Sequence, residues 1–444
     1  MSKILHLGKF FPPFAGGIEN FLADLMPAQA EQGDTVAAIV HDHQPQLSRF
    51  LAPVQAEIWH NQAIYRTPSY GRLLYAPVSP QFPFWFNRVL DEFQPQLLHL
   101  HLPNTSAFFA LWLSRARRIP WIIHWHADVV SALNSKVSIA YNAYRPFEQR
   151  LLAHAHTIVA TSPPYLASST ALQPWQNKCQ VIPLGIALAR LPEPTPEAKH
   201  WAEQQWTRAT DTIAKSDSIG KNRTTDTIAK SDSIGKKRTT DTIAKSDSIG
   251  KNRATDTIAK SDSIGKMTRI LTIGRLTYYK GHEVLIRAIA QVDGAQVFIV
   301  GKGELRQRLE TLITELNLAH KLKLLGYCSD AELTALFATC DCFCLPSLER
   351  TEAFGVVLLE AMRYAKPIIA SAIPGSGVPW VIQDAGRLVP PQDTAALAQA
   401  LQQMVDDPQM RTRLGECSRQ RFEQLFDIKQ VAEKMSALYR RVLQ

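Results

Sequence analysis

Two glutamates eight positions apart are the strongest candidates for chemistry in this sequence. Glu352 and Glu360 lie in the segment 346–362, which reads Pro-Ser-Leu-Glu-Arg-Thr-Glu-Ala-Phe-Gly-Val-Val-Leu-Leu-Glu-Ala-Met. Eight positions span about two helical turns, so both side chains face one side if the helix begins early. A carboxylate among apolar residues needs a partner, and sugar or ribose hydroxyls are suitable donors. The alternative interpretation is a capped amphipathic helix with Glu352 near its N-terminus.

Two further features could bind an anion. The loop that follows the apolar run 270–273 carries Arg275 and Lys280, which could neutralise a diphosphate, Arg by a fork and Lys as a point charge. Gly16 and Gly17 precede the first expected helix and offer free N–H groups to an anion. A solvated loop and a tight strand-to-helix turn are the alternative interpretations.

The chain is rich in His-x-His pairs. They are His41/His43, His99/His101, His124/His126 and His154/His156. Metal ligation is one interpretation of such pairs. Alternate residues on strands that end at a cleft, or chance in a histidine-rich chain, explain them as well. We therefore predict no metal site and keep His126 as a candidate sugar-site residue.

The elements that must position these residues follow one pattern twice. Short apolar runs lie at 4–7, 36–40, 97–100, 121–124, 157–160 and 181–184, and again at 270–273, 297–300, 322–325, 342–345 and 367–370. Stretches with helical spacing separate them. Apolar strands that alternate with helices predict an α/β fold with two parallel sheets in series, which are two Rossmann-like domains. In such folds ligands bind beyond the carboxyl ends of the strands, where the candidate residues lie.

A repeat of period fifteen interrupts this pattern. Thr-Asp-Thr-Ile-Ala-Lys-Ser-Asp-Ser-Ile-Gly-Lys begins at Thr210, Thr225, Thr240 and Thr255. Two isoleucines among small and polar residues cannot build a core, so we expect a disordered insertion in the linker rather than a stacked solenoid. We assign it no catalytic role.

The same reasoning divides the chain into four parts. We expect an N-terminal Rossmann-like domain at 1–190, a linker with the repeats at 191–267 and a C-terminal Rossmann-like domain at 268–426. The segment 427–444 has helical spacing, and a helix that packs back on the N-terminal domain suits this layout.

Composition excludes several classes. The net charge of +9 is spread between the repeat and the rest of the chain, without a nucleic-acid-binding motif. No apolar run is long enough for a transmembrane helix, and the first residues do not resemble a signal peptide. Cys340, Cys342 and Cys344 alternate along an apolar run, which favours a buried strand over a metal site. Reduced cysteines predict a cytoplasmic protein.

With these motifs the chain resembles glycosyltransferase family 4, the group 1 glycosyltransferases of the GT-B fold. The resemblance covers nearly everything except the repeat. It is carried by Gly16-Gly17, Gly274-Arg275, Lys280-Gly281, Phe354-Gly355 between the two glutamates, and Ile182-Pro183-Leu184-Gly185-Ile186. Leu184 and Ala187 depart from the family pattern, where many relatives have Asn and Asp.

The resemblance implies that the domain at 1–190 lies on the acceptor side and that the domain at 268–426 binds the nucleotide-sugar. It also implies a role for each candidate. Glu360 would hold the ribose hydroxyls, Glu352 would contact hydroxyls of the transferred sugar, and His126 would lie near the reacting sugar. The implied donor-binding residues are Gly16, Gly17, Arg275, Lys280, Glu352, Phe354, Gly355 and Glu360. The implied catalytic residues are His126, Arg275, Lys280 and Glu352.

The implied reaction retains the anomeric configuration and needs neither metal nor cofactor beyond the nucleotide-diphosphate sugar. We expect transfer of a hexose, such as mannose, to a glycan or lipid-linked acceptor in cell-surface polysaccharide synthesis. The alternatives are a nucleotide-sugar epimerase on the same fold and a non-catalytic nucleotide-sugar-binding protein. We also expect that the protein could contact the inner face of a membrane through aromatic and basic residues of the first domain, namely Trp85, Phe86, Arg88, Trp112, Arg115, Arg117 and Arg118.

Overall fold

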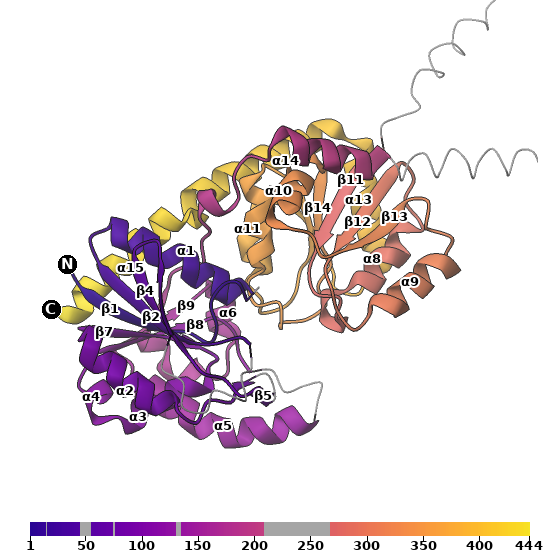
Figure 1. Cartoon of the computed structure of the whole chain (residues 1–444). Helices are drawn as coiled ribbons and strands as arrows, with labels where there is room; N and C mark the ends of the chain where they lie inside the picture. Colours follow the sequence, from indigo (N-terminus) through magenta and orange to yellow (C-terminus); the bar gives the residue numbers. More distant parts are fainter. Residues whose placement is uncertain (15, 45–54, 74–75, 130–134, 208–266) are drawn as a thin grey trace, which may run out of the picture.

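The computed structural model describes residues 1–14, 16–44, 55–73, 76–129, 135–207 and 267–444. The fifteen-residue repeats, for which we expect disorder, lie outside these residues. Two sheets, each covered by helices, form the two halves of the molecule (Figure 1). Among the described residues, no helix combines the length and the apolar content that crossing a bilayer requires.

The first sheet has eight strands in the order β10-β9-β8-β7-β1-β2-β4-β3. Only β3 runs antiparallel to its neighbour. The strands are β1 (Lys3–Leu7), β2 (Thr35–His41), β3 (Gln55–Trp59), β4 (Gln62–Thr67), β7 (Leu97–Leu102), β8 (Trp121–Trp125), β9 (Thr157–Ala160) and β10 (Cys179–Val181). Helices lie on both faces, which is why strands such as β7 are buried along their whole length. The strand order turns back at β1, which makes its carboxyl end a ligand-binding position in this fold class.

The helices around the first sheet are α1 (Gly17–Glu31), α2 (Phe82–Phe93), α3 (Phe109–Trp112), α4 (Ser114–Arg117), α5 (Ser135–His154) and α6 (Pro163–Ser168). Short 3-10 turns lie at Thr105–Phe108, Gln173–Lys178 and Leu188–Arg190, and β5 (Arg72–Leu73) pairs with β6 (Ala76–Pro77) beside the sheet.

The second sheet has six parallel strands in the order β13-β12-β11-β14-β15-β16. They are β11 (Thr268–Ile273), β12 (Ala295–Val300), β13 (Leu322–Gly326), β14 (Cys342–Leu345), β15 (Ile368–Ser371) and β16 (Gly386–Val389). Its helices are α8 (His282–Ile289), α9 (Arg306–Glu315), α10 (Asp330–Thr339), α11 (Val356–Arg363), α12 (Val378–Ile382), α13 (Thr394–Asp406) and α14 (Pro408–Arg421). Here the order turns back between β11 and β14, and Cys342 and Cys344 are buried in β14.

The last helix, α15 (Ile428–Leu443), leaves the second half and lies on the first, beside α1 (Figure 1). Its apolar stripe is buried there: Ile428, Val431, Met435 and Leu438 are at most 4% exposed. Two polar contacts fix its position, because Ser436 Oγ donates to Asp34 Oδ2 at 2.6 Å and Gln29 Nε2 donates to the Tyr439 hydroxyl at 2.6 Å. The end of the chain therefore completes the core of the first domain.

A helix at 196–207 lies in the linker directly before the repeats. Its Trp206 is buried and stacks on Phe298 with centroids 3.7 Å apart, and its carbonyl accepts a hydrogen bond from Gln296 Nε2 at 2.9 Å. The chain resumes at β11, where Thr268 lies opposite Ala295 on β12. The two ends of the repeat insertion are thus anchored at neighbouring positions of one strand.

Because these anchors lie side by side, we predict that the chain still folds when a short Gly-Ser linker replaces residues 210–265. Its rate of donor turnover should stay within a few-fold of that of the full chain. The melting temperature and the rate of donor turnover test this. Removing an anchor instead of the insertion should have the opposite result: Trp206→Ala should lower the free energy of unfolding of the second domain by about 3–5 kcal/mol, the usual cost of removing a buried tryptophan. A deletion variant that fails to fold would contradict the prediction.

Candidate functional site

The loops that follow β11 and β14 meet at the edge of the second sheet. Gly281 has a left-handed backbone (φ 69°), and a Cβ atom there would collide with the carbonyl oxygen of Pro346. Leu348 N donates to Tyr279 O at 2.8 Å. Only glycine allows this approach, so the loop with Arg275 and Lys280 is held against the loop with Glu352.

Lys280 and Glu352 form the central ion pair of this site. Lys280 Nζ lies 2.5 Å from Glu352 Oε2, both side chains are nearly buried, and Ser347 Oγ donates to the same oxygen at 2.9 Å. Burial alone would lower the pKa of Lys280, but the Glu352 carboxylate outweighs it and leaves the pKa raised. The stem of Lys280 passes over Gly274, where a Cβ would lie 3.3 Å from its Cδ and Cε. The ammonium is therefore charged and fixed in place.

Arg275 faces the first domain. Its Nη2 donates to the Tyr279 hydroxyl at 3.3 Å, and its charge acts on Lys9, which follows β1, and on Glu19 in the first turn of α1. Burial raises the pKa of Glu19, whereas Lys9, Arg275 and Arg72 oppose that rise. Three cations from both domains thus surround one carboxylate, which is an environment suited to an anion. Lys9 and Arg72 are not among the residues predicted from the sequence, although the position of Lys9 directly after the first strand is a usable signal.

The glycines before α1 lie against the start of α11. Gly16 caps α1 in an extended conformation, and a Cβ on it would collide with the Glu19 carboxylate. A Cβ on Gly17 would lie 3.3 Å from Val356 Cγ2, the first residue of α11. Gly355, with φ 77°, caps α11 in the left-handed conformation that favours glycine. The N-terminal ends of two helices from different domains therefore adjoin.

Glu360 has its own partner, separate from those of Glu352. Arg190 Nη1 lies 3.3 Å from Glu360 Oε1, and Arg190 Nε donates to Asp24 Oδ2 at 2.8 Å. Burial raises the pKa of Glu360, against the opposing charge of Arg190. The two glutamates thus lie in different hydrogen-bonded groups, one with Lys280 and one with the segment that leaves the first domain.

Phe354 faces the core of the second domain. It is 3% exposed, and its ring lies 6.5 Å from the Trp380 ring and 6.1 Å from the Phe426 ring. Its side chain therefore supports the 346–355 loop from within.

His126 lies just after β8, at the edge of the first sheet that meets these loops. Two residues further on, Asp128 Oδ2 accepts from Arg350 Nη1 at 2.5 Å, and Arg350 belongs to the 346–355 loop. His126 Nε2 bonds to His101 Nδ1 at 2.9 Å, while its Nδ1 has no hydrogen-bond partner. Burial lowers the pKa of His126 to about 3, so its ring is neutral at pH 7.

Two family models cover most of the chain. The model for glycosyl transferases group 1 matches residues 254–421, and the model for the glycosyl transferase 4-like domain matches residues 16–185. The first match includes Arg275, Lys280, Glu352 and Glu360, and the second includes Gly17 and His126.

Relatives and solved structures agree with these matches. The chain is 26% identical to the O-antigen chain mannosyltransferase C of Escherichia coli over 100% of this chain and 99% of that protein. It is 27% identical to the D-rhamnosyltransferase WbpZ of Pseudomonas aeruginosa over 69% of this chain and 64% of that protein. Sucrose-phosphate synthase from Thermosynechococcus elongatus shares the fold over 100% of this chain and 99% of that chain, with a TM-score of 0.69 at 22% identity. The Anabaena protein Alr3699/HepE, solved with UDP, shares it over 99% of this chain and 100% of that chain, with a TM-score of 0.66 at 19% identity.

The neutral state of His126 predicts a specific pH dependence of stability. Its folded pKa of about 3 lies below the ordinary value of 6.5, so the unfolded chain binds a proton that the folded chain does not. This contribution is complete above pH 6.5 and is lost as the pH falls toward 3, by about 1.4 kcal/mol per pH unit. We predict that the free energy of unfolding of His126→Asn falls less steeply between pH 6 and pH 4 than that of the wild type. Urea titrations at several pH values measure the difference, and equal slopes would refute the prediction.

Proposed function

The chain belongs to glycosyltransferase family 4, the group 1 glycosyltransferases, and on this premise we propose that it transfers a hexose, such as mannose, from a nucleotide-diphosphate sugar. The acceptor is a glycan or a lipid-linked glycan of a cell-surface polysaccharide. The names of two relatives, an O-antigen chain mannosyltransferase and a D-rhamnosyltransferase, support this choice of sugar and pathway.

The observation that carries the proposal is the fixed cation at Lys280 beside the glutamate-bearing loop. A nucleoside diphosphate gains negative charge as the glycosidic bond breaks, so cations aimed at it stabilise the transition state more than the ground state. Lys280, held by Glu352 at 2.5 Å, and Arg275, whose charge reaches Lys9 and Glu19 of the other domain, are suited to this task. Such cations do the work that a metal ion does in other transferases, which is why we propose a metal-independent reaction.

The sugar and the nucleotide use the two glutamates separately. Glu352 contacts hydroxyls of the transferred sugar, and Glu360, which lies 3.3 Å from Arg190 Nη1, holds the ribose hydroxyls. The N–H groups at the start of α1, after Gly16 and Gly17, add to the diphosphate site. His126 offers its neutral ring to the sugar, and the anomeric configuration is retained.

We predict that Lys280→Gln lowers kcat/KM for the donor by about 10²–10³, the usual cost of removing one charge-stabilising group. Glutamine keeps a donor for Glu352, so the fold survives. A thermal-shift screen of GDP-, UDP-, ADP- and dTDP-sugars first identifies the donor, and release of the nucleoside diphosphate then measures turnover. Lys302→Gln is the matched control, since Lys302 is an exposed cation on the neighbouring loop.

Full turnover by a folded Lys280→Gln variant would refute the diphosphate role. Interconversion of the nucleotide-sugar without transfer would instead indicate an epimerase, and binding without either reaction would indicate a non-catalytic protein.

A surface on α2, α3 and α4 suits contact with an anionic membrane. Phe84 and Trp112 are 64% and 59% exposed, and Arg88 on α2 and Arg117 and Arg118 at the end of α4 are exposed as well. Trp85 and Phe86, which the sequence analysis assigned to this surface, are buried in the core because they lie on the inner side of α2. Exposed aromatic and basic side chains together favour the boundary of an anionic bilayer, and peripheral contact at the cytoplasmic face would bring a lipid-linked acceptor to the first domain.

We predict that the chain sediments with vesicles that contain an anionic lipid and not with purely zwitterionic vesicles. Arg117→Glu with Arg118→Glu should abolish the binding, because about 1 kcal/mol is lost for each basic residue near the surface. Arg287→Glu with Arg413→Glu makes the same change of charge on the second domain and should leave binding intact. Equal loss in both double variants would refute a specific surface.

A further inference from the structure

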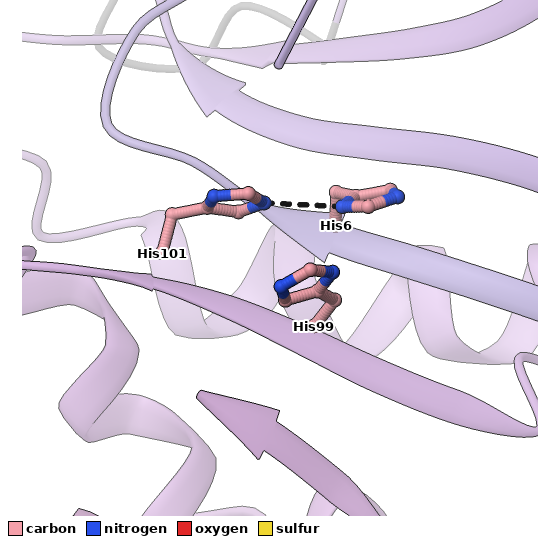
Figure 2. Close-up of side chains that lie close together, drawn as sticks. All are labelled: His6, His99 and His101. Atoms are coloured by element: carbon pink, nitrogen blue, oxygen red, sulfur yellow. Dashed lines mark hydrogen bonds between the residues drawn. The ribbon is translucent and has the colours of Figure 1, made fainter. Parts of the chain in front are cut away.

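Five buried histidines lie together on one face of the first sheet. His6 is on β1, His99 and His101 are on β7, and His124 and His126 are on and just after β8; none is more than 3% exposed. The strand register places His6 opposite His99 and His101 opposite His124. This face also carries Ile4, Leu97 and Ile122, which pack in one core with residues of α1 and α15. Figure 2 shows His6, His99 and His101 with the bond that joins two of them.

A chain of hydrogen bonds, which we call the relay, starts at His126 and runs through this cluster. His126 Nε2 bonds to His101 Nδ1 at 2.9 Å, and His101 Nε2 bonds to His6 Nδ1 at 3.1 Å. His6 Nε2 bonds to Gln29 Oε1 at 2.9 Å, and Gln29 Nε2 donates to the Tyr439 hydroxyl at 2.6 Å. The hydroxyl in turn bonds to His99 Nδ1 at 2.6 Å. The chain thus joins the edge of the sheet to the C-terminal helix.

The orientation of one group fixes all the others. Burial lowers the pKa of His6 to about 4 and that of His101 well below its usual range, so the rings are neutral and each has one donor and one acceptor nitrogen. Gln29 Oε1 can only accept, so His6 must donate from Nε2 and accept at Nδ1. His101 and His126 then carry their protons on Nε2 as well. The free Nδ1 of His126 is left with a lone pair.

We propose that Tyr439 is a positioning residue that acts through Gln29, His6 and His101 to fix His126 as a hydrogen-bond acceptor. In the proposed transferase reaction, on which this inference rests, Nδ1 of His126 accepts a hydrogen bond from a hydroxyl of the bound sugar. A hydrogen-bonded ring partner that sets the tautomer of a functional histidine is an established way of orienting it.

Tyr439 matters because the relay can also run in reverse. If the Gln29 amide turned over, its NH₂ group would donate to His6 Nε2, and every ring would move its proton to Nδ1. His126 would then present an N–H donor instead of an acceptor. In the first orientation the Tyr439 hydroxyl accepts from the Gln29 amide and donates to His99 Nδ1. The reversed orientation would also require the hydroxyl to donate to Gln29 Oε1 and His99 to carry its proton on Nδ1, so Tyr439 ties the orientation of the amide to the tautomer of His99.

Metal binding by the same histidines fits the geometry less well. Two groups of three are close enough for it, namely His6, His99 and His101, and His101, His124 and His126. In the second group the ring planes are within 19° of one another, so the lone pairs lie in nearly parallel planes and do not converge on one ion. In both groups the hydrogen bonds of the relay already occupy ring nitrogens.

The decisive measurement is the tautomer of His126, read from the ¹⁵N shifts of the two ring nitrogens in histidine-labelled full-length protein. Assignment comes from the loss of one set of signals in His126→Asn. We expect a proton on Nε2 and a lone pair on Nδ1 in the wild type. Tyr439→Phe should give mixed tautomers, because turning the Gln29 amide then no longer requires His99 to change its own tautomer. A proton on Nδ1 in the wild type, or an unchanged tautomer in Tyr439→Phe, would overturn the proposal.

Two substitutions at Gln29 separate positioning from folding. Gln29→Glu, in its ionised form, keeps a group that can only accept from His6, so it should keep the wild-type tautomer of His126. Gln29→Leu should lose it. Ser436→Ala is the matched control, since it removes a buried hydrogen bond between α15 and Asp34 without touching the relay.

For transfer, we expect kcat to fall about tenfold in Tyr439→Phe and Gln29→Leu, the value of one net hydrogen bond, with the donor KM unchanged. Gln29→Glu and Ser436→Ala should keep kcat near the wild type. A fall of equal size in Ser436→Ala would mean that only the docking of α15 matters and would overturn the proposal. Stoichiometric bound metal in the purified protein would overturn it as well. The tautomer is measured without any sugar, so the relay can be tested even if the proposed transfer activity is absent.

Discussion

A carboxylate that leaves water needs a compensating cation or hydrogen-bond donors, and this constraint organises the surface between the two sheets. Glu352 is paired with Lys280, Glu360 with Arg190, and Asp128 with Arg350. In the last two pairs the partners come from different parts of the molecule, so each ion pair also joins segments that are far apart in the sequence. Because breaking a buried pair leaves an unpaired charge, these acids fix the relative position of the loops that carry them.

The first sheet, in contrast, buries polar side chains that carry no charge. Its buried histidines stay neutral because burial disfavours the protonated ring. A neutral ring has one donor and one acceptor nitrogen, so the tautomer of one ring sets the tautomer of the ring bonded to it. Charged side chains from both domains and the neutral histidine rings of the first sheet therefore meet at one boundary.

The sequence made the fold and the loops of the second domain predictable, because buried parallel strands form continuous apolar runs and glycines mark the turns after them. The resemblance to the family 4 glycosyltransferases and the GT-B fold are confirmed. The partners of the charged residues could not be predicted, since Arg190 and Arg350 meet their acids only through tertiary packing. The burial of Trp85 could not be predicted either, because it depends on which face of α2 packs against the sheet. The link from His6 to Tyr439 depends on a contact between segments about 410 residues apart in the sequence. The roles of the individual site residues remain predictions.

The position of α15 has a consequence for how the protein is made. The first domain lacks part of its core until Val431, Met435 and Tyr439 arrive, on the order of 250 residues after its last strand has been synthesised. At about 5–20 residues per second a ribosome needs roughly 10–50 s for that stretch. During this interval the parts of α1 and of the histidine-bearing face that α15 later covers stay exposed. Translation through the repeats lengthens the wait, so the nascent chain is an expected client of chaperones that hold exposed apolar surface.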